Sequence, residues 1–135
     1  MSIVQSIRPQ AVLLEKDVSL AAASGTTVGI SVPAGVTVLA AGFQNYVVVA
    51  DVTTYTLDVT DGTTVFANDL NFDNTAANSN KGGVTPGFIA AADTIDVVTT
   101  ISGSPGVITG RVWALVVDCG AGTRTAATVD RDQLA

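Results

Sequence analysis

The chain of 135 residues is long enough for one domain with a hydrophobic core of its own. Apolar residues make up 47% of the chain but aromatic residues only 5%, so the core must consist mainly of Val, Ile, Leu and Ala, a composition typical of β proteins. The net charge is −6 and the six Lys and Arg residues are scattered singly, which argues against a nucleic-acid partner.

Residues 1–17 precede the first clear strand and are predicted to form an N-terminal arm or an edge strand. Arg8 and Pro9 interrupt the apolar residues, so the segment lacks the continuous apolar run of a signal peptide. An apolar patch follows at Val12, Leu13 and Leu14. No window of the chain approaches the roughly 18 apolar residues of a membrane helix. We therefore expect a soluble protein, made inside a cell, with no membrane partner.

Residues 18–119 are predicted to form one β-sandwich domain. Short runs with alternating or β-branched residues recur at intervals of roughly 8–12 residues, and no long stretch has the 3.6-residue period of a helix. The expected strands are Val18–Ala22, Thr26–Val32, Val36–Ala41, Asn45–Val52, Thr54–Val59, Val84–Ile89, Thr94–Ile101 and Val107–Asp118. About eight antiparallel strands of this kind suffice for two sheets.

Turn residues separate these runs. Pro33 and Gly35 lie between two expected strands, and a Ser-Gly-Ser-Pro-Gly run lies at 102–106, so each is predicted to join antiparallel neighbours. Residues 61–83 are rich in Asn, Asp and Gly and are predicted to form one long polar loop at an end of the sandwich. Residues 120–135 are predicted to form a C-terminal tail, because they contain few apolar residues.

The last expected strand is apolar on both faces. Alternation directs one set of side chains to one side and a second set to the other: Ile108, Val112, Ala114 and Val116 against Val107, Trp113, Leu115 and Val117. A strand of an isolated two-layer sandwich needs only one apolar face. Cover from the chain's own arm or loop is one explanation. We favour the other, a homo-oligomer in which Trp113, Leu115 and Val117 contact a neighbouring subunit.

No arrangement typical of an enzyme is found. The chain has no His, which excludes Ser–His–Asp and Cys–His sites, and the single Cys119 is expected to be a small buried residue in a reducing compartment. The pairs Asp58 with Asp61 and Asp93 with Asp96 could in principle do the acid and base work of a glycosidase. Asp96 alternates as an outward strand residue and Asp61 lies in a turn, so we predict no enzyme and no cofactor.

The stretch NDLNFDN has the spacing of a calcium loop. Asp69, Asn71 and Asp73 match the first three ligand positions of an EF-hand. The sixth and twelfth positions require Gly and Glu but hold Asn74 and Asn80, which excludes an EF-hand. A different kind of calcium site in a sandwich loop, built from the same three side chains with Asp61 as a further candidate ligand, remains a weak alternative.

The simpler interpretation of this stretch is a polar loop with apolar anchors. In it, Phe66, Leu70 and Phe72 pack under the sandwich while the Asp and Asn side chains face water. We favour this interpretation, and with it no metal.

The stretch FIAAADTIDVVTTISGSPGVITGRVWALVVDCG resembles the C-terminal part of small all-β proteins that decorate or cement the capsids of tailed bacteriophages. Those chains run into an "aaDTIdv" strand, a Gly-containing turn and a long "aGrVrvwvvvvd" strand. The resemblance covers about residues 45–119 and is clearest over 91–118. It implies a jelly-roll-like sandwich that assembles as a homotrimer on the capsid surface, at symmetry axes between capsomers.

What the resemblance implies about function is a structural, non-enzymatic virion protein, made in the host cytoplasm, whose partner is the major capsid protein. Weak contacts to a repetitive lattice would sum through multivalency. We assign the capsid contact to the N-terminal patch Val12, Leu13 and Leu14. The alternative is a carbohydrate- or calcium-binding sandwich of a fibre or adhesin, although one Trp and two Tyr are few for such a module.

Overall fold

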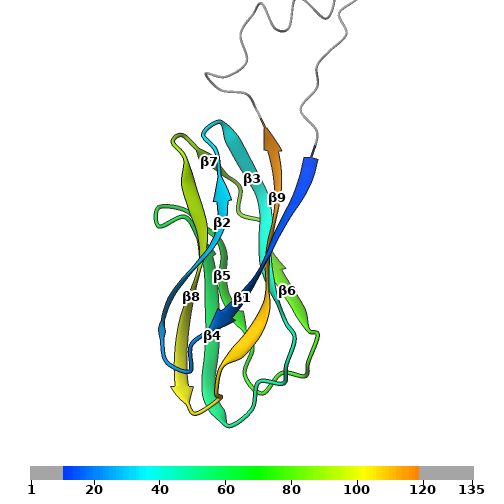
Figure 1. Ribbon diagram of the computed structural model, residues 1–135, viewed down its shortest axis with the longest axis vertical. Coiled ribbons are helices and arrows are strands. Elements are labelled where there is room, and N and C mark those ends of the chain that lie inside the picture. Colours follow the sequence, from blue (N-terminus) through cyan, green and yellow to red (C-terminus); the bar gives the residue numbers. More distant parts are fainter. Residues whose placement is uncertain (1–10, 119–135) are drawn as a thin grey trace, which may run out of the picture.

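Residues 11–118 are described by the computed structural model and form nine strands without a helix (Figure 1). The strands are β1 (Ala11–Leu20), β2 (Gly25–Val32), β3 (Val36–Asn45), β4 (Val52–Thr60), β5 (Val65–Asn71), β6 (Asn80–Gly83), β7 (Gly87–Ile89), β8 (Asp93–Gly103) and β9 (Ile108–Asp118). Two antiparallel sheets pack face to face, which confirms the predicted all-β sandwich. No helix in this part of the chain is long and apolar enough to cross a membrane.

The strand order is that of a jelly roll. The five-stranded sheet has the order β1-β9-β3-β6, with β7 also paired to β3, and the four-stranded sheet has the order β2-β8-β4-β5. If β6 and β7 are counted as two halves of one strand beside β3, the eight-stranded arrangement with two Greek keys results. The jelly-roll-like architecture is therefore confirmed.

The two predicted turns exist but join different partners from those expected. Gly35 and Gly106 have φ values of 90° and 75°, in the region that favours glycine. However, the first turn leads from β2 in one sheet to β3 in the other, and the second leads from β8 to β9 in the same way. The prediction that each joins antiparallel neighbours was wrong, because a jelly roll places most consecutive strands in opposite sheets.

The first strand begins earlier than predicted. We expected a strand at Val18–Ala22, but β1 already begins at Ala11 and pairs with β9 over ten consecutive positions. Its alternate residues Leu14 and Val18 pack against the core, and this apolar alternation continues to the buried Leu20. Residues 1–10 and 119–135, which include the outer part of the predicted arm, Cys119 and the predicted tail 120–135, lie outside the described residues.

The strand expected at Asn45–Val52 does not form. Asn45 is the last residue of β3, and residues 46–51 connect β3 to β4. Val47 and Val48 are exposed while Val49 is fully buried, so the three valines do not alternate as a strand requires. Asp51 has a φ of 60°, in the left-handed region, so the backbone is not extended at the residue before β4 begins.

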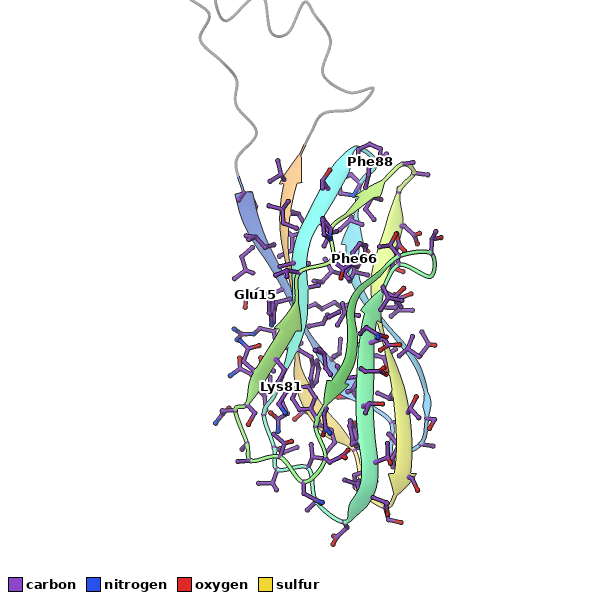
Figure 2. All side chains as sticks on the ribbon, turned by 180° about the vertical axis from the view of Figure 1, so that it is seen from behind. Glu15, Phe66, Lys81 and Phe88 are labelled. Atoms are coloured by element: carbon purple, nitrogen blue, oxygen red, sulfur yellow. The ribbon has the colours of Figure 1, made fainter. Side chains whose placement is uncertain are left out.

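The segment 61–83 is not one loop. It contains β5, which pairs with β4 through two register shifts, and β6, which pairs with β3. Phe66, labelled in Figure 2, is fully buried, as is Phe72, and Leu70 is nearly so. These apolar anchors agree with the preferred interpretation, and they are the reason that a strand forms here. The strand expected at Val84–Ile89 is likewise divided, because only residues 87–89 are extended and Val84 is exposed.

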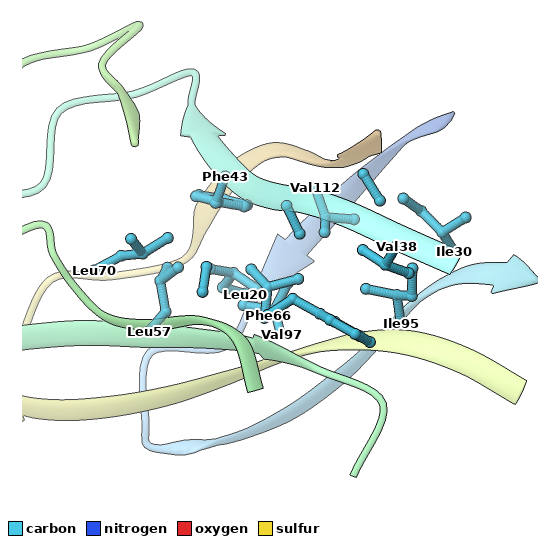
Figure 3. Packing of buried hydrophobic residues seen from close by; sticks show 14 of the residues in the cluster. Leu20, Ile30, Val38, Phe43, Leu57, Phe66, Leu70, Ile95, Val97 and Val112 are labelled. Carbon is cyan, nitrogen blue, oxygen red and sulfur yellow. The ribbon is translucent and has the colours of Figure 1, made fainter. Parts of the chain in front are cut away.

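The core fills the space between the two sheets (Figure 3). Its largest fully buried side chains are Leu20, Phe43, Tyr55, Leu57, Phe66, Phe72, Ile89, Ile95 and Ile108. Phe43 and Phe72 meet edge to face, with ring centroids 5.7 Å apart and an interplanar angle of 79°. The core is thus aliphatic with a small aromatic centre, as the composition requires.

Tyr55 carries the one buried side-chain polar atom of the described region that lacks a hydrogen-bond partner, its hydroxyl oxygen. Burial raises the pKa of Tyr55 from 10.0 to about 12. Folded protein then holds the phenolic proton more tightly than unfolded chain does. The difference in pKa between the folded and the unfolded chain therefore favours the folded state below pH 10, and this effect is lost as the pH rises through about 12.

We therefore expect Tyr55→Phe to raise the free energy of unfolding at pH 7 by about 1 kcal/mol, because it removes a buried hydroxyl that makes no hydrogen bond. The variant should also lose less stability than the wild type between pH 10 and pH 12. Urea titrations at pH 7, 10 and 12 measure both effects. Equal alkaline losses in the two proteins would contradict the prediction.

Candidate functional site

The outer faces of the two sheets differ in polarity. On the four-stranded sheet, Thr56 pairs with Thr100, and Asp58 pairs with Val98. Asp96 also lies on this face, beside Thr60. Hydroxyls and carboxylates dominate, as expected of a sheet face in contact with water.

The outer face of the five-stranded sheet has an apolar end and a charged end. Register places Leu13 of β1, Leu115 of β9 and Ala40 of β3 side by side, and the row before it contains Ala11 and Val117. We call these five residues the apolar end. Leu13 is 53% exposed, and the side chains of Leu115 and Val117 are half-buried. This face therefore offers an apolar surface that the opposite face lacks.

Strand β9 has the two-sided character that the sequence predicted. Ile108, Val112, Ala114 and Val116 are buried in the core. Trp113, Leu115 and Val117 lie on the outer face and are half-buried. The structure thus brings the three predicted oligomer-contact residues together on one surface.

The Trp113 indole lies against two glycines of neighbouring strands, Gly42 and Gly82, which we call its glycine floor. A Cβ added to Gly42 of β3 or to Gly82 of β6 would lie 2.5 or 2.6 Å from Cζ2 of the indole. The indole Nε1–H donates a hydrogen bond of 2.8 Å to Oδ1 of Asn80. The chain itself therefore covers the inner side of the ring and fixes its position, which is part of the cover that we had considered as an alternative to an oligomer.

The charged end is centred on Arg111. Its guanidinium lies 2.6 Å from a carboxylate oxygen of Glu15, and its Nε–H donates to the Tyr46 hydroxyl at 3.0 Å. The Tyr46 hydroxyl donates in turn to Asp17 at 2.5 Å, and this hydrogen bond is the main cause of the raised pKa of Tyr46. Exposed ion pairs add little stability. Their effect here is to hold four polar side chains in a fixed pattern.

A shallow cleft of about 280 Å³ separates the two ends. It is lined by Leu13, Glu15, Gln44, Asn80, Arg111 and Trp113. Sequence reasoning missed the polar members of this set. Glu15 and Arg111 are opposite charges on outward-facing positions, but they meet only because β1 pairs with β9, and that pairing is not visible in the sequence.

The predicted N-terminal contact patch does not form one surface. Leu13 points to the outer face, whereas Leu14 packs against the core. Val12 is paired with the buried Val116 but is 49% exposed, because it lies at the margin of the sandwich. Consecutive strand residues alternate in direction, so an apolar triplet on a strand cannot present all three side chains to one partner.

The three predicted calcium ligands have structural roles. The Asp73 carboxylate accepts a hydrogen bond from the Tyr55 N–H, and Asn71 Oδ1 accepts one of 2.7 Å from the Asp73 N–H. Asp69 has a φ of 51° in a bulged part of β5. No group of three potential metal-ligating side chains of the His, Cys, Asp and Glu types occurs between residues 11 and 118. These residues shape the β5 region.

The carboxylates considered for catalysis also bond to the backbone. Asp58 Oδ1 accepts from the Asp69 N–H at 2.7 Å, and Asp61 Oδ1 accepts from the N–H groups of Thr63 and Thr64 at 2.8 and 2.6 Å. Asp93 Oδ1 accepts from the N–H of Thr94 at 2.7 Å, and Asp96 Oδ1 lies 3.4 Å from the N–H of Gly29. Asp58 and Asp96 therefore bond to bulged parts of neighbouring strands, Asp61 fixes a turn, and Asp93 bonds to the residue next to it at the start of β8.

No protein-family model matches the chain, and no curated protein does. A chain of the capsid asymmetric unit of cyanophage Pam1 matches the fold with a TM-score of 0.61 at 13% sequence identity, over 84% of this chain and 88% of that chain. This chain therefore shares its fold with a chain from a phage capsid. A chain from the acid-stable capsid of Helicobacter pylori bacteriophage KHP30 gives a TM-score of 0.56, also at 13% identity, over 82% and 94%. The expected phage-capsid resemblance is confirmed at the level of the fold.

Proposed function

We propose that this chain is a structural, non-enzymatic virion protein that decorates and reinforces a phage capsid, bound to the major capsid protein as a homotrimer. The observation that carries the proposal is the jelly-roll fold shared with chains of two phage capsids over more than four-fifths of this chain. A role of this kind requires surfaces that bind protein. It does not require a reactive side chain.

The subunit contact is assigned to Trp113, Leu115 and Val117. They form one outward surface on a rigid strand in the middle of the five-stranded sheet, and burying such a surface contributes about 25 cal/mol per Å². Trp113 is already fixed over its glycine floor, so little side-chain freedom is lost when a second subunit covers it.

The capsid contact is assigned to the N-terminal patch through Leu13, its member on the outer face. Val12 is also exposed, but it is directed to the other side of β1. Both lie near the start of β1, at the end of the sandwich where β9 also ends. Leu14 takes part indirectly, because its packing against the core fixes the course of the strand. The two contact regions adjoin at Leu13 and Leu115, so trimer formation and capsid binding should influence each other.

The proposal is tested by light scattering and by co-sedimentation with purified capsids of the phage that encodes the chain. We expect a trimer that sediments with capsids. Leu115→Asp should give a monomer and reduce sedimentation at least tenfold, because a carboxylate would be placed in an apolar contact. Trp113→Asp should do the same.

The matched control is Thr100→Asp, which adds the same charge to the exposed outer face of the other sheet. It should leave both the trimer and the sedimentation unchanged. A wild-type protein that stays monomeric and ignores capsids would contradict the proposal, as would a Leu115→Asp variant that behaves like wild type while remaining folded.

A carbohydrate-binding module remains the second candidate, because the cleft combines an indole with amide and charged side chains. Trp113 is the only tryptophan of the chain, so its fluorescence reports any ligand at this cleft. A saturable change of this fluorescence with a glycan would favour the second candidate over the first.

A further inference from the structure

The sandwich has one long, regular sheet edge to which no strand of the described residues is paired. The edge strand β2 contains a bulge between Thr27 and Ile30, and β5 contains two register shifts. At the far side of the five-stranded sheet, β6 and β7 are only four and three residues long. Short or bulged edges resist the addition of another strand. By contrast, β1 has ten residues in unbroken register with β9.

The unpaired backbone groups of β1 can be identified. The N–H of Tyr46 donates to the C=O of Thr109 at 2.8 Å, so Thr109 bonds toward β3. Backbone groups of a strand point alternately to its two neighbours, so Gly110 bonds toward β1, where its partner is Val18. Even-numbered residues of β1 therefore bond to β9. Odd-numbered residues, Leu13 among them, direct their N–H and C=O groups to the free edge.

Two copies of β1 are poorly suited to pair with each other. A symmetric antiparallel pairing centred on the middle of β1 would place Glu15 opposite Glu15 or Lys16 opposite Lys16. Like charges directly opposite each other destabilise a strand pair. The free edge therefore fits a segment that has no acidic residues of its own.

We propose that residues 1–10 of a second copy of this chain add to the free edge of β1 as a further strand. The segment MSIVQSIRPQ is as long as β1, contains three β-branched residues, Ile3, Val4 and Ile7, and has Arg8 as its only charged side chain. That charge complements Glu15 and Asp17 on the strand it would join. This inference rests on the homo-oligomer proposed above, and it assigns that assembly a backbone contact in addition to the apolar one.

A contact of this kind is heterologous, since the segment of one copy meets the edge of the next. Heterologous contacts close into rings when the rotation between copies allows it, and a ring of three is consistent with the proposed trimer. Main-chain hydrogen bonds along the edge then supply affinity, as they do when other edge strands accept an extended peptide.

The test compares Leu13→Pro with Leu13→Ala in the full chain. Both variants lose the leucine side chain, but only proline lacks the N–H that points to the free edge. Proline is tolerated on an edge strand when its missing N–H faces away from the sheet. We expect Leu13→Pro to weaken self-association at least tenfold relative to Leu13→Ala in light scattering. Equal self-association of the two folded variants would overturn the inference.

Amide hydrogen exchange of the wild-type chain gives a second measurement that needs no variant. The N–H of Leu13 and Glu15 should exchange at least tenfold more slowly in the assembled protein than at dilutions where the chain is monomeric. Fast exchange at every concentration would overturn the inference. Slow exchange independent of concentration would also overturn it, because the chain's own segment would then cover the edge.

These outcomes are distinct from those that test the proposed function. Absence of co-sedimentation with capsids contradicts the decoration role, whereas the exchange of the Leu13 and Glu15 amides is measured without capsids. A chain that assembles through this edge but does not bind capsids would support the inference and contradict the proposed function.

Discussion

Replacing Asn45 by alanine is expected to lower the free energy of unfolding by about 3 kcal/mol, or roughly 1 kcal/mol for each hydrogen bond that its side chain makes. The Asn45 side chain is fully buried at the end of β3. Its Nδ2 donates to the C=O of Val47 and Ala76 at 2.7 and 2.9 Å, and its Oδ1 accepts from the Ser79 N–H at 2.9 Å. One amide thus joins two connections that are far apart in the sequence.

Asn45→Asp separates the hydrogen bonds from simple packing. The carboxylate keeps the shape and the acceptor but loses both donors and places a charge beside two carbonyl oxygens. It should cost at least as much as alanine at pH 7. Asn68→Ala is the control, because Asn68 is exposed and its side chain only contacts Asp69 at 3.3 Å; its cost should stay below about 0.5 kcal/mol.

Urea unfolding at one protein concentration measures these differences, since assembly would otherwise add to the apparent stability. The connection 46–51 should also open locally in Asn45→Ala, so the amide of Val49, which donates to the Thr75 C=O at 2.9 Å, should exchange faster. An Asn45→Ala protein that loses less than about 1 kcal/mol would show that the two connections are held by other contacts.

From the sequence it was possible to predict which side chains of the long strands face the core, but not which strands pair with each other. Alternation along β9 correctly separated the buried Val112 and Ala114 from the outward Trp113 and Leu115, because a side-chain period of two is local information. Turn residues located the connections between β2 and β3 and between β8 and β9. They did not show that each connection crosses to the other sheet, which depends on contacts distant in the chain.

Two errors have the same physical origin. Val47, Val48 and Val49 have high strand propensity, yet the Asn45 side chain hydrogen-bonds to Val47 and to two residues of a second connection, Ala76 and Ser79. These bonds hold the segment as a connection. Conversely, β5 is rich in Asn and Asp, yet it forms a strand of the sandwich because its Phe66 side chain is buried in the core. In both places tertiary contacts override local propensity.

The candidate surface was predictable only in part. The outward direction of Trp113 and Leu115 follows from alternation, whereas the glycine floor of Gly42 and Gly82 and the ion pair of Arg111 require the register of four strands. Glycine in a strand signals close approach of another group, but it does not say which group. The polar part of the surface therefore had to come from the structure.

Replacing Phe43 by alanine is expected to lower the free energy of unfolding by about 3–5 kcal/mol, because it leaves a cavity in the core and removes the edge-to-face contact with Phe72. Phe43 is fully buried, with 0% of its surface accessible to solvent. Gly110 is shaped to it, since a Cβ at Gly110 would lie 2.3 Å from Cζ of the Phe43 ring. Neighbouring backbone therefore fits this ring closely and is poorly placed to fill the space it leaves.

The matched control is Phe88→Ala on β7. Because Phe88 is 48% exposed, its replacement should lower the free energy of unfolding by less than about 1 kcal/mol. A double-mutant cycle of Phe43 and Phe72 should give a coupling of about 0.5–1.5 kcal/mol for the aromatic pair. The two replacements would be additive if the rings only filled volume independently. Because β3 holds Phe43 on its inner face and also pairs with β9, loss of this ring should loosen the strand that presents Trp113, and self-association should weaken together with stability.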